Sequence, residues 1–358
     1  MSKIRHKEYD YLFFADLQLG ERKDLNVPTT SGLNSRLLEG IDIVNQVGEL
    51  ARKFQVERIF LLGDCFELKD RIPARIMILF AEAVAKYPCP LTILKGNHDY
   101  AEDDYAPVRL LEREGKIKFI SAPYINMEIA FLPYFRKYET FTEEWKKLHE
   151  TIKGDTGFDV NVKLFLFHNT LPGSKFSNNI KAEGEFDLPT FANIRYLAGD
   201  IHLPQKVGPI QYLGSPYQVD FGEEGQDKFV YLYKADIDLL TSVELKYPKF
   251  VSIELDEQGC YPAIPKEILE GNYIKLKGEI LKEFKNEVDI TKQQIIKAYN
   301  PKFVISAVKY RTEKRARIET AKDDHQAVLS EFLQQSETEL DKQRLLEVGL
   351  DLIKEVQI

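Results

Sequence analysis

The chain contains 358 residues, of which 44% are hydrophobic and 30% are charged, and this composition excludes a largely disordered protein. Its length is sufficient for two or three domains, and we expect domains at residues 1–245, 246–317 and 318–358. The formal net charge of −8 excludes a uniformly basic nucleic-acid-binding protein. It does not exclude a phosphate-bearing substrate, because bound cations reverse the local sign of a carboxylate-rich metal site.

The first part of the chain alternates apolar strands with amphipathic helices. Residues 11–15, 58–62 and 91–94 are short apolar runs that predict buried strands. Apolar residues at helical spacing predict a helix over residues 37–54, and Pro73 marks the start of a second helix. Because polar residues follow every strand, the pattern indicates a layered α/β fold with its chemistry at the carboxyl ends of the strands.

The middle of the chain continues this pattern. A helix is expected over residues 108–114 and another over 142–153, and strands are expected at 117–120, 125–132, 164–167, 196–198 and 229–233. An aromatic group follows the strand that ends at residue 132. It could stack on bases, but packing in the core is the favoured interpretation. Its members are Tyr134, Phe135, Tyr138, Phe141 and Trp145.

The character of the chain changes after residue 246. Residues 272–277 and 303–309 predict strands flanking a helix near 281–299, which indicates a small α+β domain. Two amphipathic helices follow, the first capped by Asp323 or Asp324 and the second opened by a capping box of Ser336 and Glu339. These helices either close the core or present an apolar face to a partner.

The sequence also predicts the compartment. It contains no apolar run long enough to span a bilayer, and its N-terminus has no cleavable export signal. The cysteines Cys65, Cys89 and Cys260 are far apart and odd in number, which is typical of reduced thiols. We therefore expect a cytoplasmic protein without membrane association.

Metal-capable side chains follow five of the predicted strands. Paired carboxylates with imidazole and amide donors are the ligands of two-metal sites that hydrolyse phosphate esters. A separate imidazole can then protonate or stabilise the leaving oxygen. The residues at these strand ends are Asp16 and Gln18, Asp64, Asn97 and His98, His168, and Asp200 and His202.

The order of these motifs resembles the calcineurin-like metallophosphoesterase superfamily, whose motifs run D-x-H, G-D-x-x-[DE], G-N-H-[DE], H and G-H-x-H. Within it, the chain is most similar to the SbcD-type double-strand-break repair nucleases and their phage recombination counterparts. The resemblance implies two sheets flanked by helices, followed by a small α+β capping domain and C-terminal helices. The segments that carry it are Asp16-Leu17-Gln18-Leu19-Gly20, Gly63-Asp64-Cys65-Phe66-Glu67, Gly96-Asn97-His98-Asp99, Gly199-Asp200-Ile201-His202, Tyr212-Leu213-Gly214-Ser215-Pro216 and Phe221-Gly222-Glu223.

The resemblance also implies roles for individual residues. His98 would be the imidazole that assists the leaving group. Two positions depart from the family pattern, because its histidines are replaced by Gln18 and Asp200. Oxygen donors then outnumber imidazoles, which favours Mn²⁺, or Mg²⁺, over Zn²⁺. The implied metal ligands are Asp16, Gln18, Asp64 and His202 for one ion and Asn97, His168 and Asp200, with Asp64 shared, for the other.

The function implied by the resemblance is that of a metal-dependent DNA exonuclease and endonuclease. It would act as a homodimer with an SbcC-like, SMC-type ATPase bound through the two C-terminal helices. One alternative is a degenerate phosphoesterase scaffold that binds DNA and the ATPase without cutting. Another is a phosphodiesterase or phosphatase of small molecules. A cluster of basic residues is the candidate site for contacts to the DNA backbone, and a solvent-exposed linker is an equally good interpretation of it. The cluster consists of Lys309, Arg311, Lys314, Arg315 and Arg317.

Overall fold

The structure is a computed structural model that describes residues 8–27, 29–69, 71–99, 106–114, 116–126, 128–154, 161–312, 325–335 and 341–356. The chain forms two compact units, which we describe separately. Unit 1 comprises Met1–Ile253, Ala263–Leu276 and Lys292–Ser306, and unit 2 comprises Glu254–Pro262, Lys277–Thr291 and Ala307–Ile358. The domain boundaries expected after residues 245 and 317 stay predictions.

The first sheet of unit 1 has six strands in the order β12-β11-β1-β2-β3-β4. Strands β1 to β4 are parallel, β11 is antiparallel to β1, and β12 is antiparallel to β11. Strands β1, β2 and β3 are short runs that are largely buried on both faces, as expected for a covered parallel sheet. The strands are β1 (Tyr11–Phe14), β2 (Arg58–Leu61), β3 (Leu91–Leu94), β4 (Ile117–Ile120), β11 (Val230–Lys234) and β12 (Leu239–Val243).

The second sheet also has six strands, in the order β5-β6-β7-β8-β10-β9. Strands β6, β7, β8 and β10 are parallel, and β5 and β9 pair antiparallel at the two edges. The strands are β5 (Tyr124–Asn126), β6 (Ile129–Leu132), β7 (Leu164–His168), β8 (Arg195–Gly199), β9 (Gln205–Val207) and β10 (Ile210–Tyr212).

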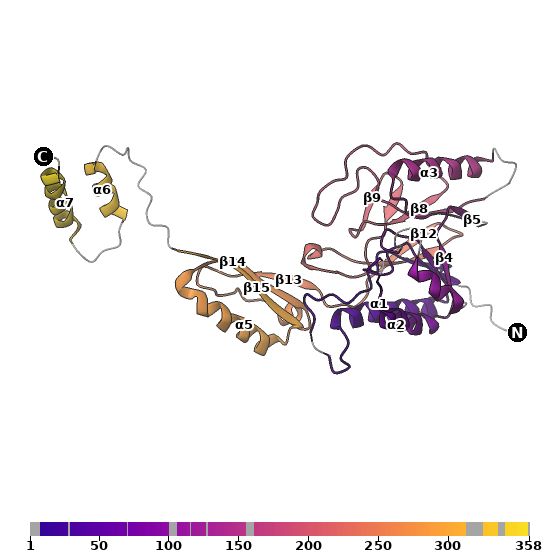
Figure 1. The fold of residues 1–358 in the computed structure, drawn as a ribbon, viewed down its shortest axis with the longest axis horizontal. Coiled ribbons are helices and arrows are strands. Elements are labelled where there is room, and N and C mark those ends of the chain that lie inside the picture. The colour runs from indigo at the N-terminus through magenta and orange to yellow at the C-terminus, as the bar shows by residue number, and fades with distance from the viewer. Residues whose placement is uncertain are drawn as a thin grey trace. The chain divides into compact units, whose positions relative to one another are not determined.

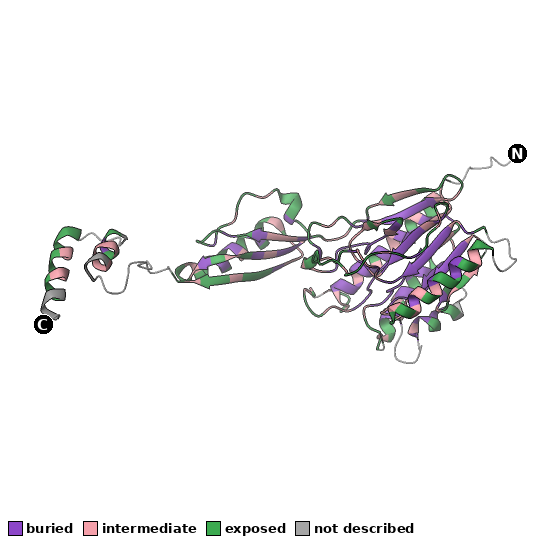
Figure 2. Cartoon of the chain, turned by 90° about the horizontal axis from the view of Figure 1, so that it is seen from above, coloured by how far each residue is buried: buried purple, intermediate pink, exposed green. Residues whose placement is uncertain are grey.

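Helices cover the outer faces of both sheets (Figure 1), and most strand residues of the two sheets are buried (Figure 2). Helices α1 (Ser35–Phe54) and α2 (Ala74–Ala85) share an apolar core with the first sheet. Helix α3 (Tyr138–Lys153) shares a second core with the other sheet. A third core, which includes Phe13, Phe60 and Leu166, lies between the sheets. This arrangement confirms the predicted layered α/β class with two sheets flanked by helices.

The chain after residue 246 contains a third sheet, with strand order β13-β14-β15. Its elements are β13 (Phe250–Glu254), α4 (Lys266–Leu269), β14 (Tyr273–Leu281), η4 (Lys282–Phe284), α5 (Lys285–Tyr299) and β15 (Phe303–Arg311). Helices α6 (His325–Gln335) and α7 (Lys342–Val356) follow. Among the described helices, none combines the length and the apolar composition that crossing a membrane requires. The predicted capping residues Asp323, Asp324, Ser336 and Glu339 lie outside the described residues.

Two predicted elements differ from the structure, and several of its strands were not predicted. The run expected as one strand over residues 125–132 is an antiparallel hairpin of β5 and β6, in which Asn126 pairs with Ile129. Apolar residues lie on both sides of the turn between β5 and β6, so the sequence pattern resembled that of a single strand. Residues 108–114 lie in a 3₁₀ helix, η2 (Pro107–Glu114), and strands β9, β10, β12 and β13 were not predicted. Tertiary pairing with β14 identifies β13 as part of a sheet.

Candidate metal centre

The predicted site residues meet at the carboxyl ends of strands from both sheets. Asp16 follows β1, Asp64 follows β2, and His168 is the last residue of β7. Ligand atoms of these three side chains lie within 4.8 Å of one another, and all three residues are buried. Parallel strands direct their carboxyl ends to the same edge, so two facing sheets bring together residues far apart in the sequence.

The backbone is strained where the acidic and amide residues enter the site. Asp16, Gln18, Asp64 and Asp200 have φ angles of 52, 49, 55 and 85°, in the left-handed region that L-residues rarely adopt. Each residue follows a strand end, so the turn redirects its side chain toward the cluster. Such strain persists where the surrounding structure enforces it, and it is concentrated at functional sites.

His168 is oriented by the backbone of the first sheet. Its Nδ1 donates to the carbonyl oxygen of Leu62 at 2.7 Å, so its other nitrogen, Nε2, is the one that faces the carboxylates. Nε2 lies 3.5 Å from Oδ1 of Asp64 and 3.7 Å from Oδ1 of Asp200. Burial by itself lowers the pKa of His168, but Asp64, Asp200 and Asp16 together raise it to about 9.

Three neighbours surround the carboxylate of Asp64. The backbone N–H of His98 donates to Oδ1 at 2.8 Å, and Nε2 of Gln18 donates to Oδ2 at 2.9 Å. The side-chain amide of Asn97 lies 2.7 and 2.8 Å from the two carboxylate oxygens. If the amide nitrogen of Asn97 faces Asp64, it donates hydrogen bonds to the carboxylate. If the amide oxygen faces Asp64, that oxygen and the two carboxylate oxygens repel one another unless a cation binds them.

The hydrogen bonding of the Asp16 carboxylate indicates whether these residues fit a metal ion. Its Oδ1 accepts the backbone N–H of Asp200 at 3.0 Å. Its Oδ2 is buried and has no hydrogen-bond partner among the described residues. Burial raises the pKa of Asp16 to about 7, despite the nearby imidazoles of His168 and His202. An unpaired buried carboxylate oxygen is costly, and a divalent cation would satisfy it. The donor set therefore fits the divalent ions that the sequence predicts.

Two glycines make room for this cluster. A Cβ atom at Gly63 would lie 2.1 Å from Nδ1 of His168, and Gly63 has a φ of +86°. A Cβ atom at Gly96 would lie 2.3 Å from Oδ1 of Asp64. Both positions therefore require glycine for a steric reason that involves a site residue directly.

Asp99 organises the backbone around Asp64. Its buried carboxylate accepts the backbone N–H groups of Gly96 at 2.9 Å and of Asp64 and Cys65 at 2.8 Å. Burial and the charge of Asp64 raise its pKa to about 6. Asp99 thus connects the loop after β3 to the loop after β2. Both of its carboxylate oxygens accept hydrogen bonds from backbone N–H groups.

His98 lies beside the cluster and is half-buried. Its Nδ1 donates to the carbonyl oxygen of Glu67 at 2.7 Å, which leaves Nε2 available for a substrate. The backbone N–H of His98 is bound to Asp64, so the backbone of His98 is fixed relative to that carboxylate.

His202 is held by a carboxylate from another segment. Its Nδ1 lies 2.7 Å from Oε1 of Glu223, in the short helix η3 (Phe221–Glu223). Burial would raise the pKa of Glu223, but His202 and Lys228 lower it to about 2. Burial lowers the pKa of His202, and Glu223 and Asp16 raise it above its usual value. No role was predicted for Lys228, because nothing in the local sequence indicates that this lysine is buried.

Asp200 contacts segments that follow strands of both sheets. Its Oδ2 accepts the hydroxyl of Thr170 at 2.6 Å, and its backbone N–H donates to Asp16. Hydrogen bonds and close polar contacts therefore connect six of the predicted metal ligands and His98. The seventh, His202, is bonded to Glu223 and influences Asp16 only electrostatically. The DNA-binding candidates Lys309 and Arg311 lie on β15 in unit 2, where Arg311 pairs with Glu257. Lys314, Arg315 and Arg317 lie outside the described residues.

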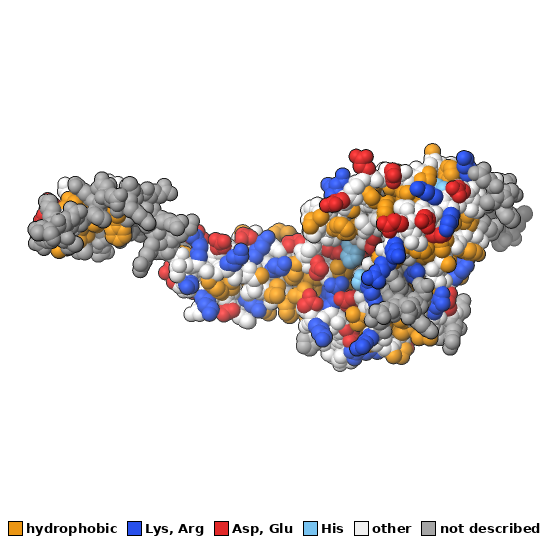
Figure 3. All heavy atoms as spheres, turned by 45° about the horizontal axis from the view of Figure 1, so that its top comes forward, with side chains coloured by type: hydrophobic (Ala, Val, Ile, Leu, Met, Phe, Trp, Pro, Cys, Tyr) orange, Lys and Arg blue, Asp and Glu red, His pale blue; other side chains and the backbone are white. Residues whose placement is uncertain are grey.

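Other polar and aromatic groups have structural roles. Phe141 and Trp145 are fully buried in the core beneath α3, as the sequence favoured, although the ring of Tyr134 lies 6.2 Å from that of His168. His149 is buried and bonded to Trp145 and Tyr196. Figure 3 shows histidine side chains at the surface of unit 1, beside acidic and basic side chains.

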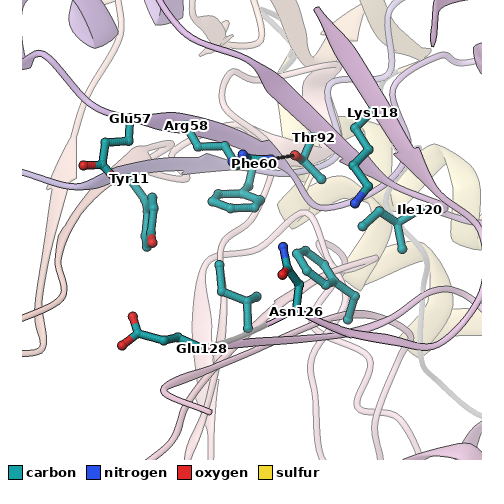
Figure 4. Close-up of a pocket in the computed structure, with 11 residues that line it drawn as sticks. Tyr11, Glu57, Arg58, Phe60, Thr92, Lys118, Ile120, Asn126 and Glu128 are labelled. Carbon is teal, nitrogen blue, oxygen red and sulfur yellow. Dashed lines mark hydrogen bonds between the residues drawn. The ribbon is translucent and has the colours of Figure 1, made fainter. Parts of the chain in front are cut away.

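A separate pocket lies at the amino ends of the strands. It has a volume of about 250 Å³ and contains both charged and aromatic side chains (Figure 4). Arg58 donates to the hydroxyl of Thr92 at 3.4 Å, and Lys118 lies on the same side of the pocket. The lining includes none of the metal-centre residues, because these follow the opposite ends of the strands.

Comparison with known protein families finds no match, and no curated protein matches the sequence. Similar solved structures include an archaeal phosphodiesterase, 9% identical with a TM-score of 0.34, over 66% of this chain and 99% of that chain. Pseudomonas putida nuclease MPE is 13% identical with a TM-score of 0.32, over 65% and 87%. The phosphoesterase Yfce from E. coli is 16% identical with a TM-score of 0.31, over 66% and 99%. At these identities, we base the function on the geometry of the site.

Proposed function

We propose that the chain is a metal-dependent phosphodiesterase that cuts DNA. The observation that carries this proposal is the buried cluster of Asp16, Asp64 and His168, in which Oδ2 of Asp16 has no partner among the described residues. Buried carboxylates need a compensating charge, and divalent cations supply it in hydrolytic sites.

We propose two positions for divalent ions. Carboxylate and amide oxygens dominate both sets, which supports Mn²⁺ or Mg²⁺. Bound ions would supply Lewis-acid activation of the phosphate and of the attacking water. Asp64 is suited to the shared position because neighbours on several sides approach its carboxylate. Asp16, Gln18 and His202 would complete one set, and Asn97, His168 and Asp200 the other.

His98 is the group that we assign to the leaving oxygen. Its Nδ1 donates to the carbonyl of Glu67, so protonation places the second proton on Nε2, where it can pass to a substrate. Because Asp64 holds the backbone of His98, the acid and the proposed metal ligands keep a constant spacing.

Partners are proposed from the second unit. The pair of α6 and α7 packs at Leu329 and Gly349 and exposes Phe332, Val348 and Leu352, at 50, 55 and 57% of their surface. Exposed apolar residues on an amphipathic helix pair support docking of an SbcC-like ATPase. DNA contact through Lys309 and its neighbours, a homodimer and a cytoplasmic location remain parts of the same proposal.

A second candidate function is a DNA-binding scaffold that does not cut. One observation favours it: Nε2 of Gln18 donates to Oδ2 of Asp64, so the amide occupies an oxygen that a shared ligand would use. To bind a metal, Gln18 must rotate and present its oxygen. The two candidates differ in whether the ion displaces this hydrogen bond.

Hydrolysis of end-labelled linear DNA with Mn²⁺ or Mg²⁺ tests the proposal. We expect cleavage by the wild type, and at least a 100-fold loss in Asp64→Ala and His98→Ala. The matched control is Asp24→Ala, because Asp24 is an exposed carboxylate. DNA binding without cleavage in either metal would support the scaffold. Faster hydrolysis of a small phosphodiester than of DNA would support the small-molecule alternative.

A further inference from the structure

The ammonium group of Lys228 is buried beside a proposed metal ligand. Its side chain is completely inaccessible to solvent, and Nζ donates to the backbone carbonyl of His202 at 2.8 Å. Nζ also donates to Oγ of Ser215 at 2.9 Å and pairs with Oε2 of Glu223 at 3.0 Å. Lys228 therefore fixes the backbone of His202 to two other segments of unit 1.

Glu223 fixes the side chain of the same histidine. Its Oε1 accepts from Nδ1 of His202, because an ionised carboxylate can only accept. Its Oε2 accepts the backbone N–H of Val219 at 3.0 Å. This arrangement commits the proton to Nδ1 and leaves Nε2 as the nitrogen that can bind a cation.

The helix that carries Glu223 is itself anchored. The carboxylate of Asp220 accepts the N–H of Gly222 at 2.7 Å and caps η3. The ring of Phe221 packs edge-on against that of Phe250, with centroids 4.8 Å apart. Glu223 therefore presents its carboxylate from a fixed backbone.

A buried ion pair at this place is not explained by stability alone. Desolvation of two charges offsets most of their attraction, and apolar residues of the same size often serve a core as well. The pair is useful where a side chain must keep one orientation, and a histidine that binds a metal is such a side chain.

We propose that Glu223 and Lys228 are positioning residues that hold the ring and the backbone of His202 for metal binding. This inference rests on the proposed function, since it assumes that His202 is a ligand. Glu223 acts on the imidazole and Lys228 on the carbonyl, so each charge of the pair orients a different part of one residue.

Calorimetric titration of the full-length, metal-free protein with Mn²⁺ tests this inference without reference to catalysis. We expect Glu223→Gln to weaken binding at one site by about 10- to 100-fold, the usual effect of removing the partner of a metal-bound histidine. Glu223→Gln also leaves Lys228 unpaired and lowers the melting temperature. The double variant Glu223→Gln/Lys228→Met removes both charges and recovers melting temperature, but not metal affinity. The control Glu224→Gln changes the exposed neighbouring carboxylate, which bonds Ser252, and keeps wild-type affinity.

Two results would overturn the inference. One is unchanged Mn²⁺ affinity in Glu223→Gln, and the other is recovery of affinity together with melting temperature in the double variant, which would reduce the pair to a structural role. Wild-type protein that binds no Mn²⁺ would instead overturn the proposed function. The two failures are therefore distinguishable in one set of titrations.

Discussion

Nε2 of His168 lies 3.5 Å from Oδ1 of Asp64, with both side chains buried at the junction of the two sheets. Asp16 and Asp200 add two further carboxylates to the surroundings of this imidazole. In the absence of a metal ion, the protonated form of His168 supplies the positive charge that these groups need. A proton and a divalent cation therefore compete for the same site.

This competition predicts that the metal-free protein loses stability in alkali. The pKa of His168 is raised from 6.5 to about 9, so its stabilising contribution is complete below pH 6.5 and is lost as the pH rises through about 9. The difference between these two pKa values of His168 corresponds to about 3 kcal/mol of unfolding free energy. Urea unfolding at pH 6.5 and 9.5, followed by fluorescence of the buried Trp145, measures it. Saturating Mn²⁺ reduces the loss, and stability that is equal or higher at pH 9.5 would contradict the prediction.

Gly63→Ala should abolish metal binding. The new Cβ would lie 2.1 Å from Nδ1 of His168, so the imidazole must move and leave the carbonyl of Leu62. Gly173→Ala is the matched control, because its φ of +90° is similar and its nearest neighbour, Cγ1 of Val207, is 3.6 Å away. Both variants carry the cost of left-handed backbone, about 1–2 kcal/mol. Only Gly63→Ala should lose Mn²⁺ affinity in calorimetry. Equal Mn²⁺ affinities of the two variants would show that His168 is not a metal ligand.

Gln18→His combined with Asp200→His should shift the metal preference toward Zn²⁺. Imidazole suits Zn²⁺, whereas amide and carboxylate oxygens suit Mn²⁺ and Mg²⁺. Histidine tolerates the left-handed backbone at both positions better than most residues. We expect the ratio of Zn²⁺ to Mn²⁺ affinity to rise at least tenfold in competition titrations. The control Gln46→His changes a half-buried residue of α1 outside the metal centre, and a ratio that matches this control would show that positions 18 and 200 do not ligate.

Asp99→Asn should destabilise the protein more than an exposed substitution. The wild-type carboxylate accepts three backbone N–H groups, whereas the amide nitrogen of Asn cannot accept. Buried donors left unpaired cost about 1–3 kcal/mol each, so we expect a loss of about 2–4 kcal/mol in urea unfolding. Asp24→Asn should change stability by less than about 0.5 kcal/mol. A similar small effect at Asp99 would mean that the loops keep their positions without it.

Lys309→Gln should lower the salt dependence of DNA binding. Lys309 is exposed on β15, and neutralising one phosphate contact reduces the slope of log affinity against log salt by about 1. Lys249→Gln is the control, because Lys249 pairs with Glu244 at 2.8 Å. Fluorescence anisotropy with duplexes of two different sequences measures the slope. An unchanged slope would mean that Lys309 is an exposed residue of β15 that does not contact DNA.

The sequence was sufficient for most strands of the two main sheets and for the residues that follow them. Strands such as β3 and β4 are apolar runs bounded by polar residues, and this local pattern needs no tertiary information. The hairpin of β5 and β6 was misread as one strand because its reversal lies inside a continuous apolar pattern. Strands β9, β10, β12 and β13 were missed, because pairing with a neighbouring strand, such as that of β13 with β14, identifies them and no local pattern does.

The sequence by itself determined which side chains stand at the strand ends, since periodicity and polarity are local properties of the chain. Only the tertiary structure decided that Asp16, Asp64 and His168 lie within reach of one ion, because β1 and β2 belong to one sheet and β7 to the other. It also decided that Lys228 and Glu223 meet His202. Burial of a charged residue depends on long-range packing, which no local pattern records.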